Sequence, residues 1–174
     1  MAIKQKIDEE LYKAFWGKLQ QAKFDIIYFN VHFNRCIKVA RVLKYLIAGV
    51  TALATGAWIT WGDVSIIGTI CAIVIWGFQG VSAIAEWFPY EKRKVELHDM
   101  VKELEPLYIE MENKWRNVQG GKISNKHVQE RLLYYETKQM EIKNHYFKND
   151  TIPERENIRK KADDLTEEYF KFFM

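Results

Sequence analysis

The sequence predicts an all-α protein: a membrane helical hairpin of two transmembrane helices, with cytoplasmic amphipathic helices that form a bundle or a coiled coil. Charged residues make up 28% of the 174 residues, yet the segment from Tyr45 to Ala85 contains only one of them, Asp63. Outside this segment, apolar residues recur at alternating steps of three and four, which is the period of an amphipathic helix. No pattern typical of a strand is present.

The first predicted element is a cytoplasmic amphipathic helix within residues 1–38. No proline interrupts it, so we expect it to run directly into the segment that follows. Its apolar positions are Ile7, Leu11, Phe15, Leu19, Ala22, Ile26, Phe29 and Phe33.

The second predicted element is a two-span transmembrane hairpin over residues 39–88. Its spans cover about 39–61 and 64–88, and Gly62-Asp63 forms the turn. A span needs about 20 apolar residues. The first apolar run, Tyr45 to Trp61, is near the short limit and borrows length from residues 39–44, whereas the second is long enough by itself. Because lipid offers the backbone no hydrogen bonds, both spans are expected to be helical, and a turn this short makes them antiparallel.

Basic residues flank the hairpin at its two outer ends, whereas the turn has none. The positive-inside rule therefore predicts a multi-pass membrane protein with both termini in the cytoplasm. The basic residues expected to anchor the hairpin at the inner face are Arg35, Lys38, Arg41, Lys44, Lys92, Arg93 and Lys94.

Small residues recur on the predicted spans at a spacing of four. Such stripes let helix backbones approach closely, and the contact is either within the hairpin or between protomers. The helix-packing candidates are Ala48, Ala52, Gly56, Gly68 and Ala72.

Three polar residues of the second span, Gln79, Ser82 and Glu86, share one helix face. Polar groups at membrane depth usually face a partner or a cavity. Gln79 lies nearest the expected midplane and is the most informative of the three. This face either lines a pore or forms hydrogen bonds that hold two helices together.

Residues 89–174 are predicted to be a cytoplasmic helical region. A helix is expected over about 90–118, bent or divided by Pro106 near Leu104, and another over about 125–149.

A last helix is expected near the C-terminus, with Asp150 or Thr151 as its N-cap and Pro153 in its first turn. The amphipathic faces of the cytoplasmic helices pack either against one another or against other copies of the chain, and the two arrangements can coexist.

No constellation typical of an enzyme is found, and no cofactor or metal ligand set is expected. Cys36 and Cys71 fit no metal or redox spacing. The net charge of +3 is too small to suggest a partner made of nucleic acid. The composition therefore favours a non-enzymatic protein whose partners are a lipid bilayer and further copies of itself.

Several features read together resemble the SLATT family of small bacterial two-span effectors, which are associated with nucleotide second-messenger and other conflict systems. These features are the basic segment RCIKVARVLK before the first span, the turn WGD, the aromatic segment EWFPYEKR at the end of the second span and the helical tail LEPLYIEMENKW. The resemblance covers most of residues 20–118. The resemblance implies an antiphage effector that a sensor or nucleotide-synthesising partner, or a second messenger, would trigger. It would then oligomerise and permeabilise the inner membrane.

Two alternatives remain open. The hairpin could be a non-conducting anchor or scaffold that presents a cytoplasmic helical interaction module. The chain could also be a holin-like phage protein, although its helical tail is long for that class.

Overall fold

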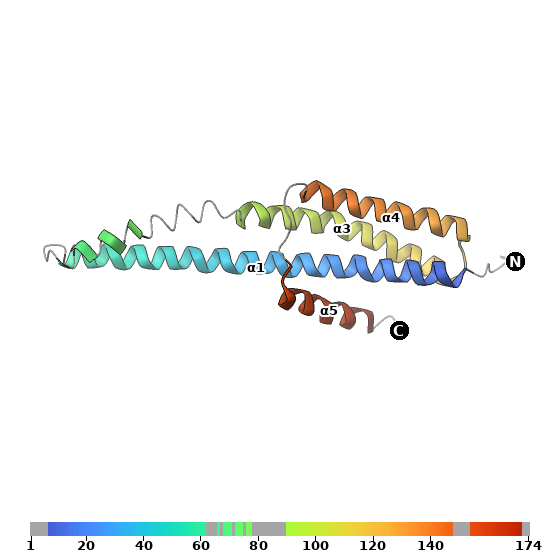
Figure 1. The fold of residues 1–174 in the computed structure, drawn as a ribbon, viewed down its shortest axis with the longest axis horizontal. Helices are drawn as coiled ribbons and strands as arrows, with labels where there is room; N and C mark the ends of the chain where they lie inside the picture. The colour runs from blue at the N-terminus through green and yellow to red at the C-terminus, as the bar shows by residue number, and fades with distance from the viewer. Residues whose placement is uncertain are drawn as a thin grey trace. The chain divides into compact units, whose positions relative to one another are not determined.

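The computed structural model describes residues 7–61, 90–147 and 154–171, together with Ile66, 68–70, 72–74, Trp76 and Gly77. Its helices, drawn in Figure 1, are α1 (Glu9–Trp61), α3 (Tyr90–Gln119), α4 (Asn125–Tyr146) and α5 (Glu156–Lys171). These ranges contain no strand, which confirms the all-α prediction. α1 is continuous over 53 residues, so the N-terminal helix does run directly into the segment that follows it.

The chain divides into two compact units. One consists of Met1–Phe33 with Val95–Met174 and is called the bundle unit here, and the other is Asn34–Lys94, called the 34–94 unit.

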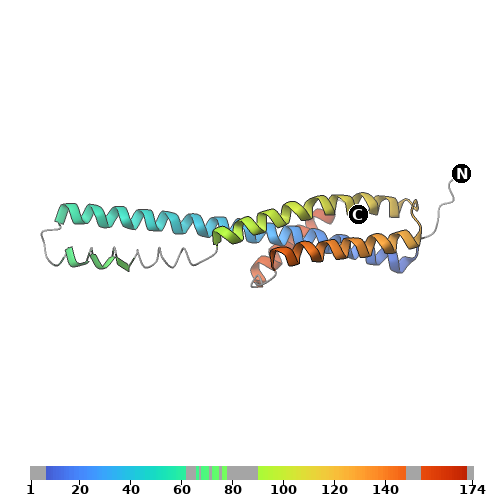
Figure 2. The same cartoon turned by 90° about the horizontal axis from the view of Figure 1, so that it is seen from above.

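The bundle unit has a core rich in aromatic side chains. The predicted stripe on α1 is buried at Phe15, Leu19, Ala22, Ile26 and Phe29, as its three-four spacing requires. α3 and α4 run alongside each other in both views (Figures 1 and 2).

Phe15 connects three of the helices. Its ring stacks on Trp115 of α3 with a centroid distance of 5.8 Å and meets Tyr135 of α4 edge-on at 6.1 Å. Such aromatic pairs add about 0.5–1.5 kcal/mol each beyond the burial of their area.

α5 packs onto this core through Ile158, Ala162 and Phe170, which are buried. The Phe170 ring meets Trp16 of α1 at 5.1 Å. The remaining face of α5 is solvated, because a helix covered on one side needs only one apolar stripe.

A lysine of α1 lies over two tyrosine rings. Lys23 Nζ is 3.8 Å from the ring centroid of Tyr169 in α5 and 4.9 Å from that of Tyr108 in α3. The two hydroxyl groups are hydrogen-bonded to each other at 3.3 Å. Burial lowers the pKa of Lys23, and the nearby carboxylates of Glu112 and Glu105 partly oppose this.

The turn between α3 and α4 contains Gly120 and Gly121. Gly121 has φ 63°, in the left-handed region, and its N–H donates to the carbonyl of Val118. The N–H of Lys122 donates to the carbonyl of Asn117. These two bonds form a Schellman motif, which ends a helix at glycine because glycine has no Cβ to strain.

The structure differs from the sequence predictions at two places in this region. α3 is not divided at Pro106, and Leu104 and Tyr108 are buried on either side of it, so packing of the helix compensates for the missing N–H. α5 begins at Glu156, after the non-helical residues Glu154 and Arg155. Asp150, Thr151 and Pro153 lie outside the described residues.

The predicted location also has to be corrected. Within the part of the chain that the structure describes, no helix is both long and apolar enough to cross a bilayer. This finding contradicts the prediction of a multi-pass inner-membrane protein with both termini cytoplasmic. α1 has the length, but charged side chains recur along it as far as Arg41 and Lys44.

Candidate association surface

Large apolar side chains lie exposed along the 34–94 unit, in contrast to the buried stripe of the bundle unit. Tyr45 is 71% exposed, Leu53 75% and Trp76 75%. Single exposed apolar residues are ordinary, but a continuous set marks a surface that binds something. The set comprises Val39, Val42, Tyr45, Leu46, Leu53, Ile66, Ile70, Ile73, Val74 and Trp76.

On α1, this surface contains a row at heptad spacing that we call the outer seam. All of its members are exposed, and they follow steps of three, four, three, four and three. They are Val39, Val42, Leu46, Gly49, Leu53 and Gly56.

A neighbouring row of α1, formed by Ala40, Leu43, Ile47 and Val50, is only half-buried. The described residues between 66 and 77 lie beside this part of α1 in both views (Figures 1 and 2). They cover one side of the helix and leave the outer seam open.

The predicted helix-packing residues divide into two groups. Ala48, Ala52 and Gly56 are exposed beside or within the outer seam, whereas Gly68 is buried and Ala72 half-buried. A methyl group added at Gly56 would meet no heavy atom within 4 Å outside its own helix turn. Contact within the 34–94 unit therefore does not cover the small residues of α1.

The predicted basic residues all belong to the 34–94 unit. Arg35, Arg93 and Lys94 are half-buried, and the others are exposed. The exposed ones are Lys38, Arg41, Lys44 and Lys92. The predicted polar face of Gln79, Ser82 and Glu86 lies outside the described residues.

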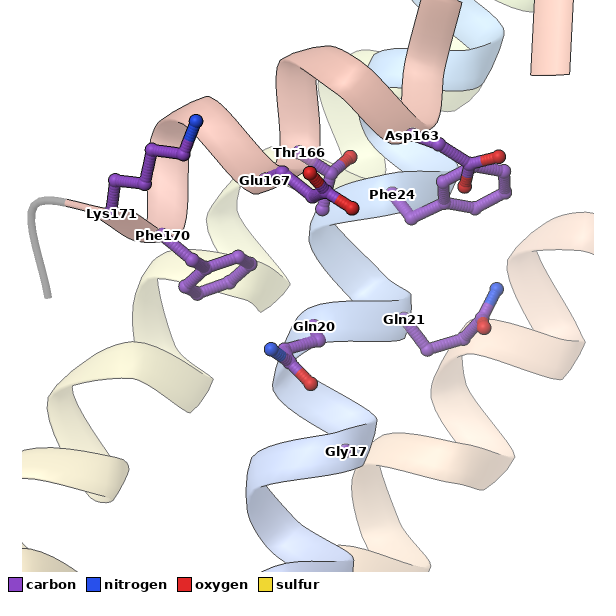
Figure 3. Close-up of a pocket in the computed structure, with 9 residues that line it drawn as sticks. All are labelled: Gly17, Gln20, Gln21, Phe24, Asp163, Thr166, Glu167, Phe170 and Lys171. Carbon is purple, nitrogen blue, oxygen red and sulfur yellow. The ribbon is translucent and has the colours of Figure 1, made fainter. Parts of the chain in front are cut away.

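The bundle unit contains a groove that the sequence did not reveal, with a volume of about 730 Å³ between α1 and α5. Figure 3 shows its lining side chains, which come from one face of each helix. Gln20 and Gln21 lie on α1, and Asp163 and Glu167 lie one turn apart on α5. No sequence signal joins these residues, because 142 positions separate Gln21 from Asp163.

One carboxylate inside the bundle unit is fully paired. Lys143 Nζ of α4 donates to Asp25 Oδ2 at 2.5 Å, and Gln21 Nε2 donates to Asp25 Oδ1 at 3.0 Å. Asp25 is only 7% exposed, so this pair satisfies a charge that would otherwise be costly to bury. Its role is structural, and the described residues hold no group of three or more metal-ligating side chains.

No family model, curated protein or solved structure matches the chain. The resemblance to SLATT effectors therefore stays a prediction, and the function is argued from the surface alone.

Proposed function

We propose that the protein acts by association: it is a non-enzymatic helical scaffold whose 34–94 unit binds further copies of the same chain and forms a homo-oligomer. The observation that carries this proposal is the set of large apolar side chains that lie exposed on that unit. Surfaces of this kind on a folded chain are interaction sites or aggregation liabilities. The three-four spacing of the outer seam favours an ordered contact between helices over unspecific aggregation.

The energetics support association. Fully covering a leucine or valine is worth about 1.5–3 kcal/mol, so covering Leu46 (56% exposed) and Leu53 (75% exposed) gains about 1–2 kcal/mol each. Association costs roughly 4–15 kcal/mol in lost freedom of motion. Two side chains cannot offset that cost, whereas the whole exposed set is large enough to do so.

The bundle unit has the complementary role of a stable module. The large apolar side chains of its core are buried among α1, α3, α4 and α5, and those of its surface that are more than half exposed are Val95, Ile109, Leu133 and Met140. A sensor or nucleotide-synthesising partner would bind there through polar contacts such as those of the groove in Figure 3.

A second candidate function is disruption of a lipid bilayer by the assembled protein, as the SLATT resemblance implies. The observation that favours it is the exposed Arg41 and Lys44 beside Tyr45 and Leu46, since basic and apolar side chains together bind anionic membrane surfaces. Release of dye from liposomes containing anionic lipid tests it, and intact liposomes at all protein concentrations would exclude it. The antiphage role stays a prediction of the resemblance.

The association is tested by the mass of the whole chain in solution. Sedimentation equilibrium should give a mass above the 20.7 kDa of one chain. Leu53→Glu should lower that mass, because it puts a charge into the exposed surface. Leu133→Glu is the matched control, since Leu133 is 65% exposed on α4 of the bundle unit. A wild-type chain that is monomeric at all concentrations would overturn the proposal.

A further inference from the structure

We infer that a second copy of the chain covers the outer seam as an antiparallel helix pair, in which each glycine of the seam meets a leucine or valine of the other copy. The inference rests on the proposed association and adds to it the surface, the partner and the orientation.

From Leu46 to Gly56 the seam alternates leucine with glycine, and this pattern favours one orientation of the pair. Heptad positions a hold Val39, Leu46 and Leu53, and positions d hold Val42, Gly49 and Gly56. In a parallel pair, a faces a and d faces d, so Gly49 would face Gly49 and Leu46 would face Leu46. Glycine layers would leave gaps between the helices while leucine layers hold them apart, which loses packing contacts.

An antiparallel pair centred between Ile47 and Ala48 places a opposite d. Leu46 then meets Gly49 of the second copy, and Val39 meets Gly56. Val42 meets Leu53, so every layer combines a larger with a smaller side chain. The six positions of the seam are thus complementary to themselves when one copy is reversed.

The glycines have the room that this contact requires. A Cβ built on Gly49 or Gly56 has no heavy atom within 4 Å outside its own helix turn, so a side chain of the second copy can approach each backbone. Glycine weakens a helix relative to alanine, and among the described residues no side chain lies close to a Cβ added at Gly49 or Gly56. Close approach of a second helix accounts for both.

The charges favour the same orientation. Arg35, Lys38 and Arg41 precede or flank the start of the seam. In a parallel pair, each of these residues would lie beside the same residue of the second copy, and the repulsion between like charges would destabilise the pair. In the antiparallel pair, Lys38 is level with residue 57 of the second copy, so the two Lys38 side chains are about 28 Å apart along the axis. That separation exceeds the screening length of about 8–10 Å at physiological salt.

Gly49→Leu tests the seam, and Thr51→Leu is its matched control. Thr51 is exposed on the opposite side of α1, so Thr51→Leu places a leucine on the same helix away from the seam. Gly49→Leu should weaken self-association at least tenfold in sedimentation equilibrium, whereas Thr51→Leu should change it less than twofold. Circular dichroism should show undiminished helix content for both, because the added side chain at position 49 has open space in the single chain.

Disulfide trapping tests the orientation. Mixing Leu46→Cys chains with Gly49→Cys chains under mild oxidation should give mainly the mixed disulfide, with the wild-type chain reporting any background from Cys36 and Cys71. If the Leu46→Cys chains instead link to one another, the antiparallel orientation is wrong.

The outcomes separate this inference from the proposed function. If wild type self-associates and Gly49→Leu associates as strongly, the outer seam is not the interface and the inference fails, while the scaffold function stands. If wild type does not self-associate, the scaffold function fails as well.

Discussion

Replacing Lys143 by methionine should destabilise the bundle unit by about 2–3 kcal/mol, because it leaves the buried carboxylate of Asp25 without its cation. The Asp25 side chain is 11% exposed, and only the amide of Gln21 at 3.0 Å would remain as a donor. Removing the opposite partner is less costly. In Asp25→Asn the lysine side chain, already 35% exposed, can turn its ammonium group toward water, so we expect a loss of about 1 kcal/mol.

The double variant Asp25→Asn/Lys143→Met should lose about as much as Asp25→Asn alone, since it contains no buried charge. The double-mutant cycle then gives a coupling energy of about 2 kcal/mol. Urea unfolding followed by circular dichroism at 222 nm measures all four chains, at a concentration low enough to exclude effects of association. In thermal unfolding, Lys143→Met should lower the midpoint by about 4–12 °C for a chain of this size.

The decisive result is which of the two single variants loses more stability. If Asp25→Asn destabilises as much as Lys143→Met or more, the carboxylate is not buried against Lys143, and the argument from desolvation is refuted. A coupling energy near zero would refute it equally.

Three further predictions concern the bundle unit. Phe15→Ala should cost about 3–5 kcal/mol in urea unfolding, because the side chain is fully buried, and a loss below about 1 kcal/mol would contradict this packing. Burial and the carboxylate of Glu110 raise the pKa of Tyr135, so the folded chain keeps a proton that the unfolded chain loses above pH 10. Stability should therefore fall above pH 10 by up to about 1.4 kcal/mol per pH unit from this group, and Tyr135→Phe should make the decline shallower between pH 10 and 11.5; an unchanged slope would contradict it. Ser124→Ala should cost about 1 kcal/mol, because Ser124 Oγ accepts from the His127 N–H at 3.4 Å, and hydrogen exchange in the first turn of α4 should quicken, whereas unchanged exchange would speak against the cap.

The helices of the bundle unit were predictable because their signals are local. The three-four stripe from Phe15 to Phe29 lies on one face of any α-helix, and it is the face that is buried. The end of α3 was equally predictable, since Gly121 permits the left-handed conformation that the turn needs. Pro106 misled because a local rule was overridden by tertiary packing on both sides of it.

The partners within the bundle unit were not predictable from one sequence. Asp25 and Lys143 are 118 positions apart, and each on its own is typical of a solvated helix face. Only the packing of α4 on α1 makes one of them a buried charge. The groove between α1 and α5 depends on tertiary structure in the same way.

The association surface was predicted in part, and its setting was wrong. The sequence identified Ala48, Ala52 and Gly56 as packing residues and left open whether the contact lies within the chain or between chains. It attributed the same apolar run to a span across a bilayer, because composition alone does not distinguish lipid from protein as the apolar neighbour. The side chains of the outer seam are exposed and those of the neighbouring row of α1 are half-buried, and this difference is known only from a structure.

The position of Lys23 over the rings of Tyr108 and Tyr169 gives the molecule a built-in spectroscopic reporter. Aromatic ring currents shield protons held above a ring face, so the ε-methylene protons of Lys23 should resonate upfield of those of every solvated lysine. Since Tyr169 belongs to α5, detachment of that helix from the bundle unit would return the signal toward its ordinary position. A single resolved resonance would thus follow the docking of α5 in real time, without any added label.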